Sequence, residues 1–410
     1  MSSEIKADKW SPASGTSATI GDSGDTYTIP SGVNFTNNGT ATGFGITAAN
    51  FRPNAQPLII NGDMAVAQRA TSVTGITGSG YNTVDRFKIP FIMGTWTQTQ
   101  ESLTSGNAYT DGFSNALKMD CTTADASVGS SDRLALSYSI EGQDLQLLKK
   151  GTANAEKVTV SFWIKATKTG TNILELYDND NNRQISIAYT VSSSNTWEKK
   201  VVNFLADTTG VLGDDNGSSL AINWWMGAGS NFSSGTLSTS WSSVTDANRA
   251  VGQVNHADST SNNFHITAVQ LEVGEYTSST LPPFQHESYG DNLSRCQRYY
   301  YFHVSEAENG GSDTTISLTS QYNPSSMKGF LTFPTQMRTK PTLKQNTGSN
   351  MYRVYENNSN ATMTSLTLSS ETTYNTAVFT AGSTISVTSG SSGTLQTMDS
   401  TAFVAFDAEL

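Results

Sequence analysis

The chain has 410 residues, 14% of them charged, and a formal net charge of −11. This length exceeds one ordinary hydrophobic core and predicts two or three domains. Nucleic-acid backbones are bound through clustered Lys and Arg, and this chain has no basic run longer than a pair. The sequence therefore excludes a nucleic-acid-binding protein.

The composition predicts an all-β fold. The chain contains 34 glycines and is rich in Ser, Thr and Asn, a mixture typical of short strands joined by tight turns. No stretch is long and apolar enough for membrane insertion, and the first ten residues lack the apolar centre of a signal peptide. Cys121 and Cys296 fall in different predicted domains, so we expect two reduced structural thiols. We therefore expect a chain made and folded in a cytoplasm.

Residues 1–54 form the first predicted region. Single hydrophobic residues are spaced by turn residues, as in 21–33, and are too few to close a core. A disordered arm is one interpretation. We favour the other, an anchoring and oligomerisation arm that becomes ordered by wrapping around identical partner chains.

Residues 55–290 form the second predicted region, a β-sandwich. Within 157–165, Val, Val, Phe and Ile alternate with Thr, Ser, Trp and Lys, which is the period of a strand with one buried face. Residues 142–150 predict a small helical turn. Turn-rich clusters such as 178–182 separate the candidate strands. These strands are 58–60, 85–90, 95–100, 116–119, 133–139, 158–166, 172–177, 184–189, 197–204, 220–226 and 264–273.

Residues 291–410 form a smaller C-terminal β domain opened by a short helix. Asp291 or Asn292 is the candidate cap of that helix, because a short side-chain oxygen can accept a first-turn N–H. In the closing run, Val404, Phe406, Ala408 and Leu410 fall on one strand face, so we expect the C-terminus to lie within a sheet. The candidate strands are 329–334, 337–343, 351–355, 364–368 and 403–410.

The sequence contains no recognisable catalytic motif. The four histidines are scattered without the spacing of metal ligands. No nucleophile elbow or phosphate-binding loop occurs, and no pair of carboxylates stands out for glycoside hydrolysis. We predict that the chain is not an enzyme and has no catalytic residues.

Aromatic and amide side chains are the better candidates for ligand contacts. A flat ring can cover the apolar face of a sugar, while amides reach its hydroxyl groups. Within 95–100, a Trp and two Gln share one strand face. Trp224 and Trp225 fall on opposite faces, so one of their rings is expected outside the core. Two more aromatic residues lie in polar loops. Packing in the core or between subunits is the alternative for each ring. The candidate sugar contacts are Trp96, Gln98, Gln100, Tyr109, Trp225 and Trp241.

The stretch 270–301 carries the clearest resemblance to a known family. Its pattern of QLE-x-G, PF, H, SYG, L and CQRYY is similar to strings in tail-fibre and other virion proteins of bacteriophages and prophages. The FP-x-x-MR-x-x-PT pattern at 333–342 and the terminal DAEL resemble the C-terminal domain of the same proteins. The resemblance implies a tail-fibre or adhesion subunit on the virion that binds a host surface glycan or receptor. It also implies a homotrimer that joins other virion proteins through residues 1–54.

Segments of 55–290 resemble the carbohydrate-binding jelly rolls of glycosidase accessory modules. They are 58–63, 115–119, 161–166, 195–197 and 266–272. That resemblance implies a structural calcium ion, for which Asp63 is the candidate ligand. The closing strand lacks the Asp usual in that family, so capping of a turn is an equal alternative for Asp63. No other cofactor is expected.

Other interpretations remain open at this point. The first interpretation is a tail adhesin. The second is a non-receptor structural or decorating protein of head, neck or tail, and the third is a carbohydrate-binding accessory module. A depolymerising tailspike is a fourth. For Cys296 and Arg298, we favour a buried thiol and an arginine that bridges two domains over a reactive thiol beside a cation.

Overall fold

The computed structural model describes residues 56–309, 313–323, 326–356, 358–382 and 391–410. The predicted arm of residues 1–54 lies outside this range. The chain divides into two compact units, and every element below belongs to the second, Ala49–Leu410. Regular structure within it is almost entirely β, so the all-β prediction is confirmed. No described helix is long and apolar enough to cross a membrane.

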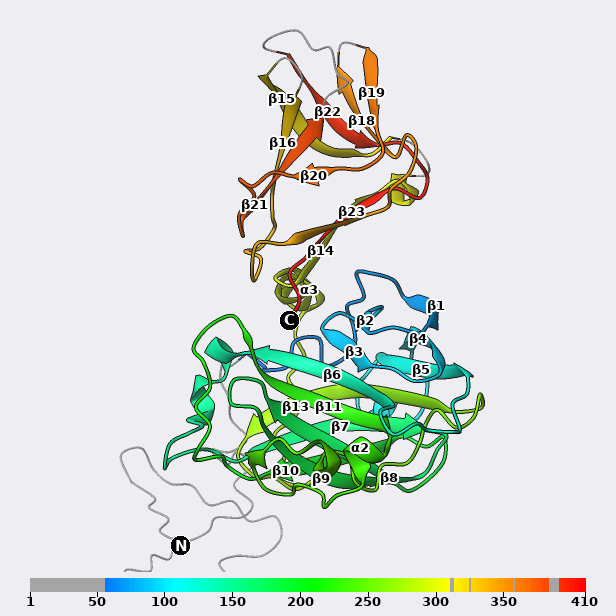
Figure 1. Ribbon diagram of the computed structural model, residues 1–410, viewed down its shortest axis with the longest axis vertical. Helices are drawn as coiled ribbons and strands as arrows, with labels where there is room; N and C mark the ends of the chain where they lie inside the picture. The colour runs from blue at the N-terminus through cyan, green and yellow to red at the C-terminus, as the bar shows by residue number, and fades with distance from the viewer. Residues whose placement is uncertain (1–55, 310–312, 324–325, 357, 383–390) are drawn as a thin grey trace, which may run out of the picture. The chain divides into compact units, whose positions relative to one another are not determined.

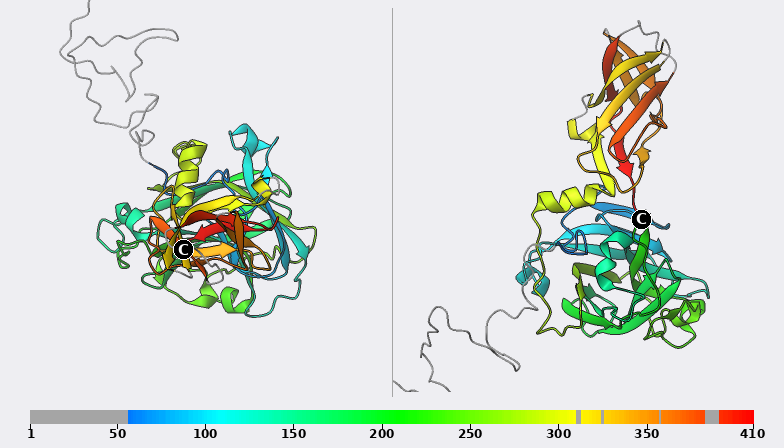
Figure 2. Two further views of the ribbon diagram at one scale, coloured as in Figure 1. Left: turned by 90° about the horizontal axis from the view of Figure 1, so that it is seen from above. Right: turned by 90° about the vertical axis from the view of Figure 1, so that its left-hand side faces the viewer.

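Two antiparallel sheets form a β-sandwich (Figures 1 and 2). Among the described residues, the first sheet has the order β1 (Ser72–Ile76), β4 (Thr95–Ser102), β5 (Asn115–Thr123), β13 (Asn263–Val273), β7 (Val158–Ala166) and β10 (Glu198–Phe204). The second has the order β12 (Ser242–Ser243), β9 (Arg183–Val191), β8 (Gly170–Asp178), β11 (Ser218–Ala228), β6 (Arg133–Glu141), β3 (Phe87–Phe91) and β2 (Gly80–Tyr81).

Strand alternation builds the core between these sheets. The predicted inward residues of β7 are all buried: Val158, Val160, Phe162 and Ile164. From the facing sheet, the Trp224 ring meets the Phe162 ring edge-on, with centroids 5.8 Å apart. The predicted strands match the observed ones closely for β6 to β11, because these strands are long and bury one face.

One predicted strand is a turn. Residues 58–60 enter a buried bend in which Asn61 and Met64 have φ values of 61° and 60°. Asn61 holds this bend, since its amide Nδ2 donates to the carbonyls of Val66 and Asp85 at 2.8 and 3.0 Å. The predicted helical turn at 142–150 is present as two 3₁₀ turns, η2 (Gly142–Asp144) and η3 (Gln146–Leu148). The other short turns are α1 (Asn107–Thr110), α2 (Ser230–Ser233), η4 (Asp246–Asn248) and η5 (Ala307–Asn309).

The C-terminal part opens with helix α3 (Tyr289–Gln297). Its cap is Ser288, whose Oγ accepts a hydrogen bond from the Asp291 N–H at 3.2 Å. Asp291 and Asn292 therefore lie in the first turn, and the predicted cap was placed three residues too late. The helix begins earlier because Ser288 supplies the required short side-chain oxygen.

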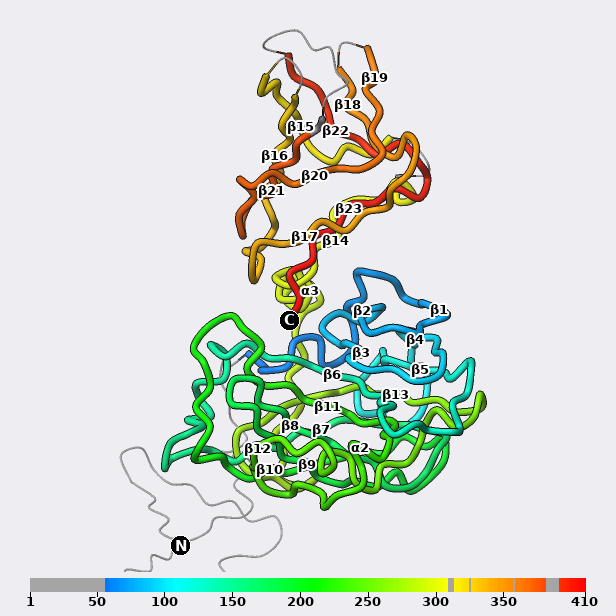
Figure 3. Tube along the Cα trace, viewed as in Figure 1, coloured from blue at the N-terminus to red at the C-terminus, as the bar shows by residue number. Residues whose placement is uncertain are grey.

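Two further antiparallel sheets follow the helix. The smaller one has the order β14 (Tyr300–Ser305), β23 (Phe403–Asp407) and β17 (Thr342–Gln345), which run side by side in Figure 3. The larger has the order β19 (Ser359–Met363), β18 (Tyr352–Glu356), β22 (Ser392–Thr397), β15 (Thr315–Asn323), β16 (Ser326–Thr332), β21 (Thr376–Gly382) and β20 (Thr367–Leu368). The expected closing strand is present as β23, the middle strand of the smaller sheet, but it ends at Asp407, so Ala408 and Leu410 lie beyond it.

The predicted strand at 337–343 is mostly loop. Only its last residues belong to β17, which begins at Thr342. Proline has no N–H to donate to a ladder, and Pro341 directly precedes the strand. Within the preceding loop, the Arg338 N–H donates instead to the Arg298 carbonyl at 2.7 Å.

Side chains from 296–299 connect helix α3 to the sandwich. Both cysteines are free and buried, as expected, and Cys296 packs with Ile60, Val66 and Tyr299. Arg298 makes two hydrogen bonds to the Glu141 carboxylate, at 2.9 and 2.7 Å. The bridging role predicted for Arg298 is therefore present.

Candidate functional site

Three of the predicted ligand contacts share a strand face, but that face is directed inward. Trp96 is fully buried in the core and its Nε1 donates to the Met93 carbonyl at 2.8 Å. Gln98 is also buried, and its Oε1 accepts from the Thr83 N–H and hydroxyl at 3.2 and 3.0 Å. Gln100 donates to the carbonyls of Met64 and Ala65. These side chains satisfy local backbone groups, and Trp96 and Gln98 offer no surface to a ligand.

Trp225 is outside the main core, as predicted, yet it is also fully buried. It packs beneath α2 with Ile173, Phe232 and Ala250. Its Nε1 donates to Glu175 Oε2 at 3.1 Å. Trp225 therefore packs under the outer surface of the second sheet and is not exposed on it.

Tyr109 and Trp241 keep some exposure but lie apart from this region of the sheet. Tyr109 is 47% exposed on α1. Trp241 is half-buried, its Nε1 donates to the Leu205 carbonyl at 2.7 Å, and the Lys150 ammonium lies 4.5 Å from its ring. Sugar contact at either residue stays a prediction.

Asp63 lies at the turn that opens the sandwich. Its Oδ1 accepts from the Asn292 amide at 3.2 Å and from the Ala65 N–H at 3.4 Å. Within the described residues, no group of three or more His, Cys, Asp or Glu side chains could hold a metal ion. Calcium binding at Asp63 stays a prediction, and the contact with Ala65 fits the turn-capping alternative.

A groove on the outer face of the second sheet brings together polar and aromatic side chains. Its cavity has a volume of about 470 Å³. It is lined from β3, β6, β8 and β11 and by the loop that carries Arg249. Because Leu136, Ile222 and Leu176 face the core, their strand neighbours face the groove. These outward residues include Ser137, Ser139, Tyr177, Ala221 and Asn223.

A buried carboxylate fixes the geometry of this groove. Glu175 is fully buried, and Arg249 Nε and Nη2 donate to its two oxygens at 2.7 and 2.9 Å. Asn223 Nδ2 and Trp225 Nε1 also donate to Oε2, at 3.0 and 3.1 Å. Four donors thus bind one carboxylate. These hydrogen bonds fix the positions of the Arg249, Asn223 and Trp225 side chains in the ligand-free protein.

The charges of the groove depend on the same contacts. Burial alone would lower the pKa of Arg249, but the Glu175 carboxylate more than offsets this and the pKa is raised. Burial and the nearby charge of Arg249 lower the pKa of Arg133. The Arg133 guanidinium lies 3.9 Å from the Phe91 ring centroid, and that of Arg249 lies 4.8 Å from the Tyr177 ring.

The resulting surface combines two half-buried rings with oriented donors. Phe91 and Tyr177 supply ring surface, while Asn223, Arg133 and the serines of β6 supply hydrogen-bonding groups. A ligand that suits this lining has apolar faces and many hydroxyl groups. None of the six sequence candidates lines the groove.

Sequence reasoning missed these groove residues. The alternation in 172–178 and 218–228 could have marked Tyr177 and Asn223 as outward on neighbouring strands. No local signal marks Arg249, which lies in a loop 74 residues from the carboxylate it binds.

Comparisons with known proteins gave the following results. No protein-family model matches the sequence, and no curated protein matches it. The chain is similar to the enzymatically active domain of bacteriophage CBA120 tailspike protein 4. The match covers 53% of this chain and 21% of that structure, at 13% identity and a TM-score of 0.27. The chain therefore spans about a fifth of that structure.

Two sugar-related structures are also similar at the same low level. A putative sugar binding protein from Bacteroides thetaiotaomicron matches 53% of this chain and 100% of its own, with 14% identity and a TM-score of 0.28. The family 11 carbohydrate-binding module of a Clostridium thermocellum cellulosomal cellulase matches 50% of this chain and 99% of its own, with 12% identity and a TM-score of 0.26.

Proposed function

We propose that this chain binds carbohydrate in the groove on the outer face of the second sheet. The observation that carries the proposal is the array of Tyr177, Asn223 and Arg249 around the buried Glu175 carboxylate. The half-buried Tyr177 ring lines a cavity of about 470 Å³, and the Glu175 carboxylate holds Asn223 and Arg249 in place beside it. Fixing the donors in advance reduces the ordering cost of binding a flexible, hydroxyl-rich ligand.

We further propose that the carbohydrate belongs to a host cell surface and that the chain is a tail-fibre or adhesion subunit of a bacteriophage. The sequence resemblance within 270–301 supports this part. In this proposal the chain acts as a homotrimer, joins other virion proteins through residues 1–54 and catalyses no reaction. Three linked copies of a weak site gain avidity when they engage one surface together.

The groove is tested with a glycan array and titration of the best binder against the purified chain. We expect Tyr177→Ala to weaken binding at least tenfold, because the ring is lost. Asn223→Ala should weaken it by a similar factor, because the Glu175 network is disturbed. Tyr374→Ala, which removes a tyrosine that is 51% exposed in the C-terminal part, is the matched control and should bind as wild type.

Two results would contradict the groove proposal. One is a folded wild-type chain that binds no glycan on the array. The other is equal binding by wild type and Tyr177→Ala. The virion proposal is tested separately by labelling the protein on phage particles, and label on the head alone would contradict a tail adhesin.

A further inference from the structure

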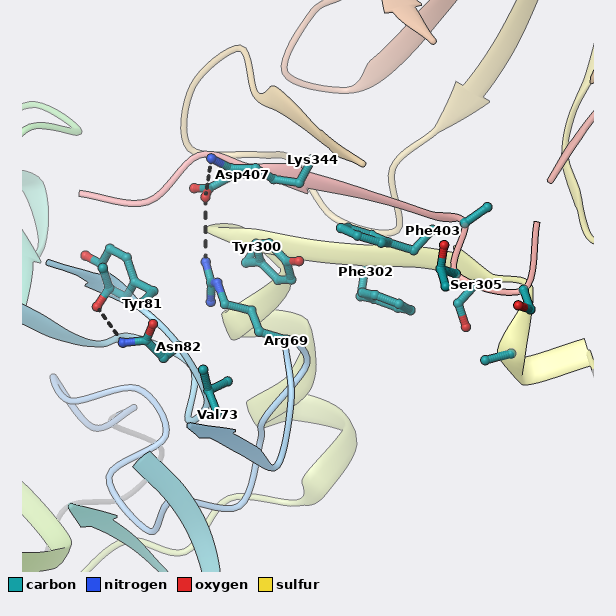
Figure 4. Close-up of a pocket in the computed structure, with 15 residues that line it drawn as sticks. Arg69, Val73, Tyr81, Asn82, Tyr300, Phe302, Ser305, Lys344, Phe403 and Asp407 are labelled. Atoms are coloured by element: carbon teal, nitrogen blue, oxygen red, sulfur yellow. Dashed lines mark hydrogen bonds and ion pairs between the residues drawn. The ribbon is translucent and has the colours of Figure 1, made fainter. Parts of the chain in front are cut away.

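A second and larger hollow lies beside β14 and β23 and shares no lining residue with the groove. Its Tyr81 contacts two groove residues, since the Tyr81 hydroxyl donates to the Leu410 carbonyl at 2.9 Å and the Lys88 ammonium lies 5.4 Å from the Tyr81 ring. Its volume is about 670 Å³, within the range of roughly 300–1,000 Å³ typical of sites for small ligands. Figure 4 shows its two walls. Strand residues such as Phe302 and Phe403 form one, and Val73, Tyr81 and Asn82 form the other.

Two parallel phenyl rings give the first wall an apolar surface. The centroids of Phe302 and Phe403 are 6.0 Å apart and their planes differ by 11°. Both rings are half-buried, so part of each remains open to the hollow. They face this way because the alternate residues of β23, Val404 and Phe406, are buried in the C-terminal core.

The charges that line the hollow are already paired. Arg69 lies 3.9 Å from Asp407 and 3.3 Å from Glu409, and Lys344 lies 3.6 Å from Asp407. The Arg69 guanidinium also covers the Tyr300 ring at 3.7 Å. The lining therefore offers no surplus positive charge to a phosphate or a carboxylate ligand.

The edge of β14 is closed to an added peptide strand. Gln68 Nε2 donates to the Tyr300 carbonyl at 2.6 Å, and its Oε1 accepts from the Phe302 N–H at 3.4 Å. These are the two hydrogen bonds that a neighbouring strand would make. A peptide would have to displace this side chain, so strand addition at this edge is disfavoured.

Polar side chains also line the hollow. Ser305 lies near the phenyl rings and Asn82 lies on the opposite wall (Figure 4), and Thr401 is a further lining residue. These side chains already have partners within the chain: Asn82 Nδ2 donates to the Gly80 carbonyl at 3.4 Å, Ser305 Oγ accepts from the Glu308 N–H at 3.2 Å, and Thr401 Oγ1 donates to Asp399 at 2.6 Å. Their remaining donors and acceptors suit a ligand that carries hydroxyl groups. A pyranose has apolar faces and a polar edge, and therefore matches both the rings and these polar side chains.

We propose that this hollow is a second carbohydrate site, which takes a neutral oligosaccharide with one sugar ring stacked on Phe302 and Phe403. The hollow and the groove share no lining residue, so this proposal does not depend on whether the groove binds sugar. With both sites, one chain would engage two segments of the same glycan or two different glycans.

The test uses the full chain carrying Tyr177→Ala, which removes the main ring of the groove. Cellotetraose, maltotetraose, mannotetraose and chitotetraose are titrated by calorimetry, with sialyllactose as the anionic probe. We expect at least one neutral tetrasaccharide to bind, and Phe302→Ala to weaken that binding at least tenfold. Phe330→Ala, which removes a phenyl ring 54% exposed on β16, is the matched control and should have no effect.

A blocking variant covers the case in which Phe302→Ala fails to fold. Thr401 is exposed and lines the hollow, so Thr401→Trp adds bulk to the hollow without removing a packed side chain. We expect it to abolish tetrasaccharide binding. The proposal is overturned if no neutral tetrasaccharide binds, if Thr401→Trp binds as tightly as its parent, or if sialyllactose binds more tightly than every neutral sugar. If the wild-type chain binds a neutral tetrasaccharide and the Tyr177→Ala chain binds none, the groove proposal is supported and the proposal for the hollow is overturned.

Discussion

At the residue scale, Arg86 shows how a buried charge can connect distant parts of the chain. It is 1% exposed and has a φ of 74°. Its guanidinium pairs with Glu409, donates to the Ser139 carbonyl at 2.7 Å and lies 3.4 Å from the Tyr299 ring centroid. Breaking a buried ion pair costs more than forming it gains, because the remaining charge loses its partner.

We expect Arg86→Ala to lower the free energy of unfolding by about 3–5 kcal/mol. Urea denaturation followed by tryptophan fluorescence measures the change. Lys157→Ala is the control, since the Lys157–Glu275 pair is exposed at 46% and 56% and such pairs contribute about 0–1 kcal/mol. Equal stability of the two variants would contradict the role assigned to Arg86.

His256 makes the stability depend on pH. It is fully buried, its Nε2 lies 2.7 Å from Asn172 Oδ1, and burial together with the Lys168 charge lowers its pKa to about 3. The unfolded chain therefore binds a proton near pH 6.5 that the folded chain does not accept. This contribution is fully present above pH 6.5 and is lost as the pH falls toward 3, by up to about 1.4 kcal/mol per pH unit.

We expect His256→Gln to flatten the loss of stability between pH 6.5 and pH 4. Urea midpoints measured at pH 7, 5.5 and 4.5 test this. His286→Gln removes an exposed imidazole and serves as the control. An unchanged slope in His256→Gln would contradict this role of His256. Asp85 cannot supply the loss, because burial raises its pKa to about 6 and its contribution therefore has the opposite sign.

At the element scale, strand edges need protection because an open edge can pair with another chain. Strand β14 lies at an edge of its sheet, and Gln68 occupies the hydrogen-bonding groups of Tyr300 and Phe302 there. The same amide also donates to the buried carboxylate of Asp85. One side chain thus satisfies two buried acceptors and closes an edge.

Gln68→Ala should cost about 1–3 kcal/mol, because it leaves buried acceptors without donors. It should also increase self-association at high concentration. Denaturation and sedimentation velocity measure the two effects. Gln336→Ala is the matched control, since that glutamine is exposed. A Gln68→Ala chain as stable and as monodisperse as this control would rule out the proposed closure of the β14 edge.

Local sequence patterns predicted some elements better than others. Strands β7, β8 and β11 were recognised because they are nine to eleven residues long and apolar, with buried residues on both faces. Strands β1, β2 and β12 were missed because they are short and lie at sheet edges. The hydrophobic run at 58–60 was predicted as a strand, but the positive φ of Asn61 turns the chain there.

At the scale of the whole molecule, residues 1–54 are predicted to anchor the chain. They lie outside the described residues, so this role depends on the sequence pattern alone. We expect a chain lacking 1–54 to remain folded and to fail to join phage particles, because every described element lies beyond residue 54. Western blotting of purified particles from a complemented deletion phage measures incorporation, and normal incorporation would contradict the anchoring role.

The sequence by itself determined the all-β class, the faces shared by residues within a strand, and the burial of both cysteines as free thiols. Alternation shows that Trp96 and Gln98 lie together, but it does not show which face of the strand is covered. Only the tertiary structure decided that this face is internal, and it assembled the groove from strands β3, β6, β8 and β11. The physical reason is that a face becomes buried, or a groove forms, through pairing between strands far apart in sequence. Arg86 and Glu409 illustrate this, since they meet across 323 positions.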